Sequence, residues 1–122
     1  MSNASKISDL QTALKTISGL NIYIYPIDPA RIVLPLCEIS MPEMELMQMS
    51  SGNNQFTELN ISLTIAVLSN RDETTKLSAM QNMMNLIDTI KDKKCIAITD
   101  IKTSAGIIAN KEVYLAQIQG LI

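Results

Sequence analysis

The chain has 122 residues, 47% of them hydrophobic, which is enough to form one domain with its own core. Its net charge of −2 offers no electrostatic basis for binding nucleic acid or an anionic membrane. No apolar run approaches the length of a membrane span, and no signal peptide is visible. We therefore expect a single domain over residues 5–122, preceded by residues 1–4 as a disordered start or the remnant of an expression tag.

The first predicted element is an amphipathic helix over residues 6–18. Ser5 is suited to cap its start, and Gly19 is suited to end it. β-branched and aromatic residues then predict a strand over 21–25. The apolar stripe of the helix has a three-four-three spacing and consists of Ile7, Leu10, Leu14 and Ile17.

A loop bracketed by prolines, residues 26–31, contains Asp28 and Arg31. The next run, residues 32–39, is almost continuously apolar, which is typical of a strand that is covered on both faces. Pro35 lies within this run and cannot donate a hydrogen bond to a neighbouring strand, so we expect it at a sheet edge or a bulge.

Residues 41–55 mix methionines and acids and reach the turn signal Gly52-Asn53-Asn54. We expect an extended arm or hairpin limb here, pairing with the start of the next strand. An arm with apolar residues on both faces needs cover on both faces, which either its own domain or a neighbouring subunit can supply. The candidate oligomer interface consists of Glu43, Met44, Glu45, Leu46, Met47 and Met49.

The clearest pattern in the chain is the alternation over residues 56–68. Strict alternation predicts a strand with one dry face and one wet face. At roughly 3.3 Å per residue, this strand would span about 40 Å. We expect the apolar positions to face the helices and the polar positions between them to face solvent. The apolar positions are Leu59, Ile61, Leu63, Ile65 and Val67.

A second amphipathic helix is predicted over residues 72–91, with Asp72 and Glu73 at its positive end. We expect the methionines at 80–84 to lie in the core. Two further strands are predicted over 95–103 and 112–119, joined by residues 104–111, which carry turn signals at Gly106 and at Asn110-Lys111. The apolar stripe of the helix is Leu77, Met80, Met84 and Ile87, widened by Met83, Leu86 and Ile90.

The predicted order is therefore α-β-β-(β)-β-α-β-β, where the bracketed strand is the arm at 41–55. This order predicts an α+β fold in which two helices pack on one face of a mostly antiparallel sheet of about four to five strands.

The residue types that usually carry chemistry are scarce. The chain has no histidine, and its four glycines are too scattered to form a phosphate-binding loop. Cys37 and Cys95 lie in apolar runs, which favours buried free thiols in a reducing compartment over a disulfide, and two isolated cysteines cannot form a zinc site. We therefore expect no catalytic residues, no metal site, no cofactor and no enzymatic activity.

Two charged pairs nevertheless allow a functional interpretation. Glu43 and Glu45 would share one face of a strand, either as paired acids for catalysis or cation binding, or as a solvated edge that blocks aggregation; we favour the edge. Asp28 and Arg31 would form either a substrate clamp or a loop ion pair, and we favour the ion pair.

Four segments in chain order carry a resemblance to a known family. They are Gly19-Leu20-Asn21-Ile22-Tyr23, Pro26-Ile27-Asp28-Pro29, Ile32-Val33-Leu34-Pro35-Leu36 and Val67-Leu68-Ser69-Asn70-Arg71-Asp72. With the first helix and the long alternating strand, from about residue 6 to 120, they resemble the small tail terminator and neck (head-tail joining) proteins of long-tailed bacteriophages and prophages. The methionine-rich segment 41–49 and the last stretch 104–122 depart from that pattern, which leaves terminator, neck and minor tail protein open.

The resemblance implies a non-enzymatic structural protein of virion assembly. Members of this family form homo-oligomeric rings, typically hexamers, that cap the tail tube and join it to the head. The implied partners are copies of the chain itself, the tail tube and the head-connector proteins. The implied location is the cytoplasm of the bacterial host during assembly and then the virion tail. The alternatives are an adaptor in another bacterial assembly and a small-substrate enzyme.

Overall fold

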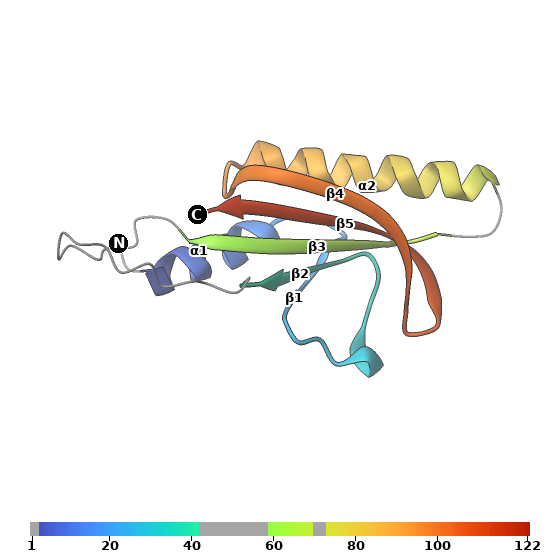
Figure 1. The fold of residues 1–122 in the computed structure, drawn as a ribbon, viewed down its shortest axis with the longest axis horizontal. Coiled ribbons are helices and arrows are strands. Elements are labelled where there is room, and N and C mark those ends of the chain that lie inside the picture. Colours follow the sequence, from blue (N-terminus) through green and yellow to red (C-terminus); the bar gives the residue numbers. More distant parts are fainter. Residues whose placement is uncertain (1–2, 42–58, 70–72) are drawn as a thin grey trace.

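A computed structural model describes residues 3–41, 59–69 and 73–122 of the chain. Within these residues, two helices cover one face of a five-stranded sheet (Figure 1). The α+β prediction is thus confirmed, and the predicted arm at 41–55 lies outside the described residues except for Met41. The elements are α1 (Asn3–Lys15), β1 (Asn21–Ile24), the short 3₁₀ helix η1 (Pro29–Arg31), β2 (Leu36–Ser40), β3 (Asn60–Leu68), α2 (Glu73–Lys93), β4 (Ala97–Ile108) and β5 (Lys111–Leu121).

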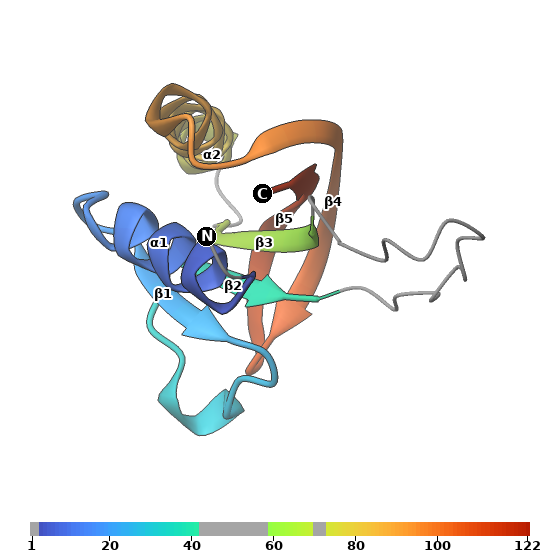
Figure 2. The ribbon, with the colours of Figure 1, turned by 90° about the vertical axis from the view of Figure 1, so that its left-hand side faces the viewer.

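The strands lie side by side in the order β1-β2-β3-β5-β4. β1 runs parallel to β2, and every other neighbouring pair is antiparallel. Helix α1 packs beside β1, and α2 packs on β3 and β5 (Figure 2). Strand β4 is therefore one of the two edge strands of the described sheet, and it lies beyond the part that the two helices cover.

Helix α1 begins earlier than its predicted span. It starts at Asn3, so Ser5 lies inside the helix and does not cap it, and residues 3 and 4 belong to the domain. Ala4 and Lys6 are good helix formers, which favours this extra turn. The chain leaves the helix through a turn in which the Ile17 amide donates to the Leu14 carbonyl at 3.1 Å. Gly19 follows in the left-handed region, with φ +78°, the conformation for which glycine is suited at a helix end.

The strand predicted over 32–39 is shorter than expected, because β2 begins only at Leu36. Residues 32–35 instead fold over the sheet face that is turned away from the helices. There Ile32 and Leu34 pack against a small buried cluster formed by Leu36, Ala66 and Val113. The side-chain amide of Asn21 ties this segment to β1 by donating to the carbonyls of residues 33 and 35, at 3.2 and 3.1 Å.

Strand β3 has 9 residues and spans about 30 Å at about 3.3 Å per residue; residues 56–58 of the predicted strand of about 40 Å lie outside the described residues. Its alternation is confirmed on the helix side, where every predicted apolar position from Leu59 to Val67 is buried. The opposite face is only partly wet, because Ser62 and Ala66 are also buried. The sheet therefore has a main core under the helices and a smaller cluster on its other face.

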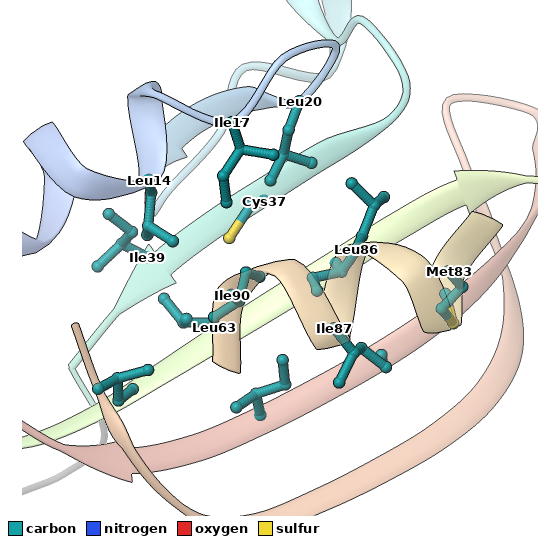
Figure 3. Close-up of a cluster of buried hydrophobic side chains, with 14 of the residues drawn as sticks. Leu14, Ile17, Leu20, Cys37, Ile39, Leu63, Met83, Leu86, Ile87 and Ile90 are labelled. Carbon is teal, nitrogen blue, oxygen red and sulfur yellow. The ribbon is translucent and has the colours of Figure 1, made fainter. Parts of the chain in front are cut away.

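The main core joins both helices to the centre of the sheet. Figure 3 shows Leu14 of α1 and Ile90 of α2 directed toward Cys37 and Leu63 on the strands beneath them. Leu14, Cys37, Leu63 and Ile90 are all fully buried. At about 25 cal/mol per Å² of apolar area, such burial is the main stabilising contribution to a domain of this size.

The predicted apolar stripe of α2 is partly wrong. The buried side chains are Ala79, Met83, Leu86, Ile87 and Ile90, whereas Leu77, Met80 and Met84 are 57%, 51% and 51% exposed. At about 100° per residue, these three lie roughly 60–120° around the helix axis from Met83. Sequence spacing alone could not separate the stripe that faces the sheet from the neighbouring flank.

The last two strands are longer than predicted, with 12 residues in β4 and 11 in β5. The predicted connection over 104–111 is wrong, because the turn consists only of Ala109 and Asn110, with φ of 50° and 64°. Two consecutive residues with positive φ match the twist of a tight hairpin. Gly106, which we expected to mark the turn, lies inside β4.

A candidate interface beside strand β4

At alternate residues of β4, the backbone N–H and C=O groups point sideways from the edge of the sheet, away from β5. Leu59 and Ile122 exchange two backbone hydrogen bonds of 3.0 Å, and the Ser69 amide donates to the Glu112 carbonyl at 3.0 Å. Even-numbered positions along β5 therefore bond toward β3, and odd-numbered ones bond toward β4. Their partners on β4 are even-numbered from residue 100 onward, so the odd-numbered residues of β4 point their N–H and C=O groups away from β5.

The side chains of these same residues lie on the helix face of the sheet. Ile101 pairs with buried Ile118, and Thr103 pairs with buried Ala116, both part of the main core. Yet β4 itself is exposed at these positions, with Ile101 41% and Ile107 72% exposed. We name this set the outer row; it consists of Ile101, Thr103, Ala105 and Ile107.

An apolar groove lies between the outer row and α2. It has a volume of about 450 Å³ and includes Met80 and Met84 from the exposed flank of the helix. We call it the β4 groove; its lining is Met80, Met83, Met84, Thr103, Ser104, Ala105 and Tyr114. Methionine side chains adapt to varied shapes, which suits a surface that packs against a partner.

The opposite flank of α2 has a different character. There Thr75, Ser78 and Asn82 face the segment 32–35 across a wider, open hollow of about 740 Å³. This hollow is larger than the β4 groove, but its helix side is polar, and Lys111 is the only ionisable side chain among the described residues that line it. The described part of its lining therefore brings together no cluster of ionisable groups.

The interface residues predicted from the sequence cannot be placed. Glu43, Met44, Glu45, Leu46, Met47 and Met49 all lie outside the described residues. The sequence did not single out the outer row, because we expected a connecting loop from residue 104 onward. Two signals for it were present: the alternating Ile101 and Thr103, and Asn110 as a tight-turn residue.

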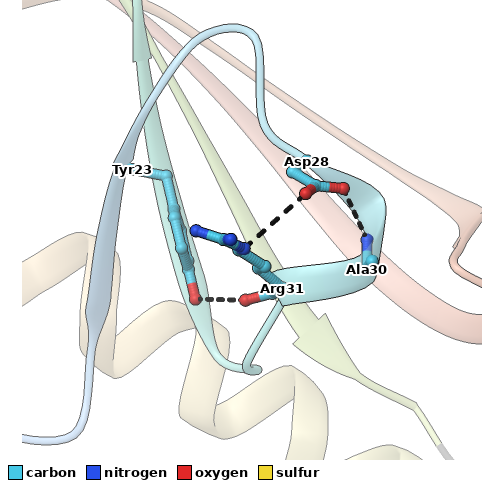
Figure 4. Close-up of polar contacts among 4 residues, drawn as sticks. All are labelled: Tyr23, Asp28, Ala30 and Arg31. Carbon is cyan, nitrogen blue, oxygen red and sulfur yellow. Dashed lines mark hydrogen bonds and ion pairs between the residues drawn. The ribbon is translucent and has the colours of Figure 1, made fainter.

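The loop after β1 is held by local polar contacts (Figure 4). A carboxylate oxygen of Asp28 accepts a hydrogen bond from the Ala30 amide at 3.0 Å, and its other oxygen lies 3.8 Å from Nε of Arg31. The Tyr23 hydroxyl donates to the Arg31 carbonyl at 3.1 Å. The same hydroxyl accepts from the Val33 amide at 3.1 Å. Both charged side chains of the pair are largely exposed, so the loop ion pair is confirmed, and it contributes little to stability.

The two cysteines are free thiols. Burial, with smaller contributions from Cys95 and Glu38, raises the pKa of Cys37 to about 12. Burial also raises the pKa of Cys95, which is only partly buried, and that of Glu38. Both thiols therefore keep their protons at neutral pH and are poor nucleophiles there. The prediction of free thiols is confirmed, with Cys95 less buried than expected.

Comparisons with known proteins give no family assignment. No model of a protein family matches the chain, and no curated protein matches its sequence. In the described part of the chain, no helix is both long and apolar enough to cross a membrane.

Proposed function

We propose that this protein is a non-enzymatic structural component of virion assembly, similar to the tail terminator and neck proteins of long-tailed bacteriophages and prophages. It forms a homo-oligomeric ring, a hexamer as is typical of that family, which caps the tail tube and joins it to the head. Its partners are further copies of itself, the tail tube and the head-connector proteins. It assembles in the host cytoplasm and ends in the virion tail.

The observation that carries this proposal is the edge of β4. A long edge strand is usually blunted, because its unpaired N–H and C=O groups attract other strands. Here residues 100–108 form nine regular positions after the irregularity between Ile98 and Asp100, and the outer row is flanked by the apolar β4 groove. This surface favours pairing with another protein over display to water.

The sheet also supports the ring geometry. Its other edge, β1, carries Ile24 and is followed by Tyr25, which are 50% and 64% exposed. Two different apolar edges at opposite ends of one sheet are suited to head-to-tail contacts, and head-to-tail contacts that close produce rings. The mechanism is steric: the closed ring stops tube growth and presents a second face to the connector.

The first test is assembly. We expect a species on the order of six subunits at high protein concentration, seen by native mass spectrometry and by electron microscopy as rings. In a polymerisation assay with the tail tube protein, added rings should stop tube elongation. A protein that stays monomeric at every concentration and leaves elongation unchanged would contradict the proposal. A monomer that binds a different assembly protein would favour the adaptor alternative.

A further inference from the structure

We infer that β1 and α1 of the next copy fill the β4 edge and the β4 groove at each ring junction. This inference rests on the proposed function, because it assumes that copies associate head to tail. It names the two surfaces that meet, which neither the resemblance nor the comparisons provide.

The backbone of β1 offers the matching set of groups. The Asn21 amide donates to the Pro35 carbonyl, and the Tyr25 amide donates to the Ile39 carbonyl, both at 3.0 Å. Odd-numbered residues of β1 therefore bond toward β2, and the N–H and C=O groups of Ile22 and Ile24 point outward. The outward groups of β1 can thus meet those of the outer row of β4.

The side chains on both edges agree in their direction. Ile22 pairs with Cys37, and Ile24 pairs with Ile39, so both lie on the helix face, as the outer row does. Residues that are hydrogen-bonded across two strands share one face of a sheet. Joining these edges therefore keeps the helices of both copies on the same side. If the outward-bonding residues of one edge had carried their side chains on the other face of the sheet, the helices of the neighbouring copy would lie on the opposite side.

The strand directions agree as well. β1 and β2 run one way, β3 runs the other way, β5 returns, and β4 reverses again. When every copy has the same orientation, as a head-to-tail ring requires, β1 of the next copy runs antiparallel to β4. The junction is therefore an ordinary antiparallel pair, which is the commoner arrangement in sheets.

The helix layer is completed in the same step. Within one copy α1 packs beside β1, so α1 of the next copy would lie above β4, where neither described helix makes a major contact. A two-fold contact between two β4 edges has no such benefit. It would add α2 of the partner at a distance and leave the outer rows of both copies uncovered. The uncovered outer row thus favours β1 with its helix as the occupant.

One flank of α1 remains for the neighbouring copy. The flank that carries Lys6, Asp9 and Ala13 faces residues 94–97 of its own copy, directly after the end of α2. The opposite flank, with Ile7, is on the side of β1 and is therefore the one that meets the neighbour.

The decisive experiment tests β1 of the next copy as the occupant. Ile24→Pro removes one outward N–H of β1, which an edge strand tolerates, and leaves the β4 edge unchanged. We expect it to weaken self-association at each junction about 2- to 10-fold in sedimentation velocity.

Two further variants test the surfaces themselves. Thr103→Pro removes one outward N–H, which an edge strand tolerates, and should weaken each junction about 2- to 10-fold. Met84→Glu should weaken it about tenfold or more by placing a charge in the apolar β4 groove, whereas the control Asn85→Glu, on the outer side of the same helix turn, should not. Circular dichroism and the unfolding midpoint would confirm that each variant is folded.

The outcomes separate this inference from the proposed function. Rings that form normally with Thr103→Pro and Met84→Glu would overturn the inference and leave the function standing. Loss of rings with these variants, but normal rings with Ile24→Pro, would overturn β1 and α1 as the occupant. A wild-type protein that neither forms rings nor caps tubes would remove the function itself, whatever the variants do.

Discussion

One row of side chains crosses the sheet on its helix face, and its two ends differ sharply. The row passes from Ile39 on β2 through Leu63 and Ile118 to Ile101 on β4. The first three are buried, with Leu63 at 0% exposure, whereas Ile101 is 41% exposed. These residues share their chemistry and their face. The difference arises because the helix layer ends above β5, so apolar character in this chain serves the core at the centre and a surface at the edge.

The largest expected effect tests this comparison directly. Leu63→Ala removes a fully buried side chain and should lower the free energy of unfolding by about 2–5 kcal/mol, from the lost transfer energy and the cavity that remains. Ile101→Ala should cost under about 1 kcal/mol in the monomer, because its side chain is already partly in water. Urea unfolding of dilute protein measures both. Equal losses would mean that β4 belongs to the core of the monomer.

The centre of the sheet is also the part that the sequence predicted well. The alternation from Leu59 to Val67 fixed which face of β3 is buried, because a period of two leaves only one choice of face. The order of the elements and the single helix-covered face followed from the same patterns. The fold class was therefore accessible from local periodicity alone.

The β4 edge of the sheet could not be predicted from the sequence in the same way. Met80 and Met84 have the spacing of a core stripe, and only the position of α2 over β3 and β5 turns them toward solvent. Gly106 suggested a turn, yet cross-strand pairing with Val113 keeps it in β4. Local propensity cannot report where a helix layer ends or how far a hairpin continues, since both depend on residues distant in the chain. The candidate site consists of such positions.

A second, smaller effect contrasts two glycines, Gly120 on β5 and Gly106 on the edge strand β4. A Cβ at Gly120 on β5 would lie 2.5 Å from Cγ1 of Ile96 and 2.7 Å from the Ala97 carbonyl oxygen. Because the backbone oxygen cannot move aside easily, Gly120→Ala should cost about 1–3 kcal/mol in urea unfolding. A Cβ at Gly106 meets only the tip of the Leu115 side chain, at 2.9 Å. Gly106→Ala should therefore change stability by less than about 1 kcal/mol in either direction. A larger loss at Gly106 would show that the β4 edge is packed as tightly as the interior.

The smallest effect concerns the next row of the sheet, which runs from Cys37 on β2 through Ile65 and Ala116 to Thr103 on β4. At its buried end, the folded protein raises the pKa of Cys37 from 9.0 to about 12, mainly by burial. Below pH 9 the thiol keeps its proton in both the folded and the unfolded chain, so it has no pH-dependent effect on stability. As the pH rises from 9 to 12, the unfolded chain releases this proton while the folded chain retains it, and stability falls by about 1.4 kcal/mol per pH unit.

Other groups also titrate in this range, so the measurement is a difference between two proteins. Wild type and Cys37→Val, which keeps a small apolar side chain in the same position, are unfolded in urea at pH 8 and at pH 10. We expect wild type to lose about 1.4 kcal/mol more than the variant between these two values. An equal loss in both proteins would mean that the Cys37 thiolate is accommodated in the folded state. The buried end of the row would then be as open to water as the edge at Thr103, and the contrast between centre and edge would not hold.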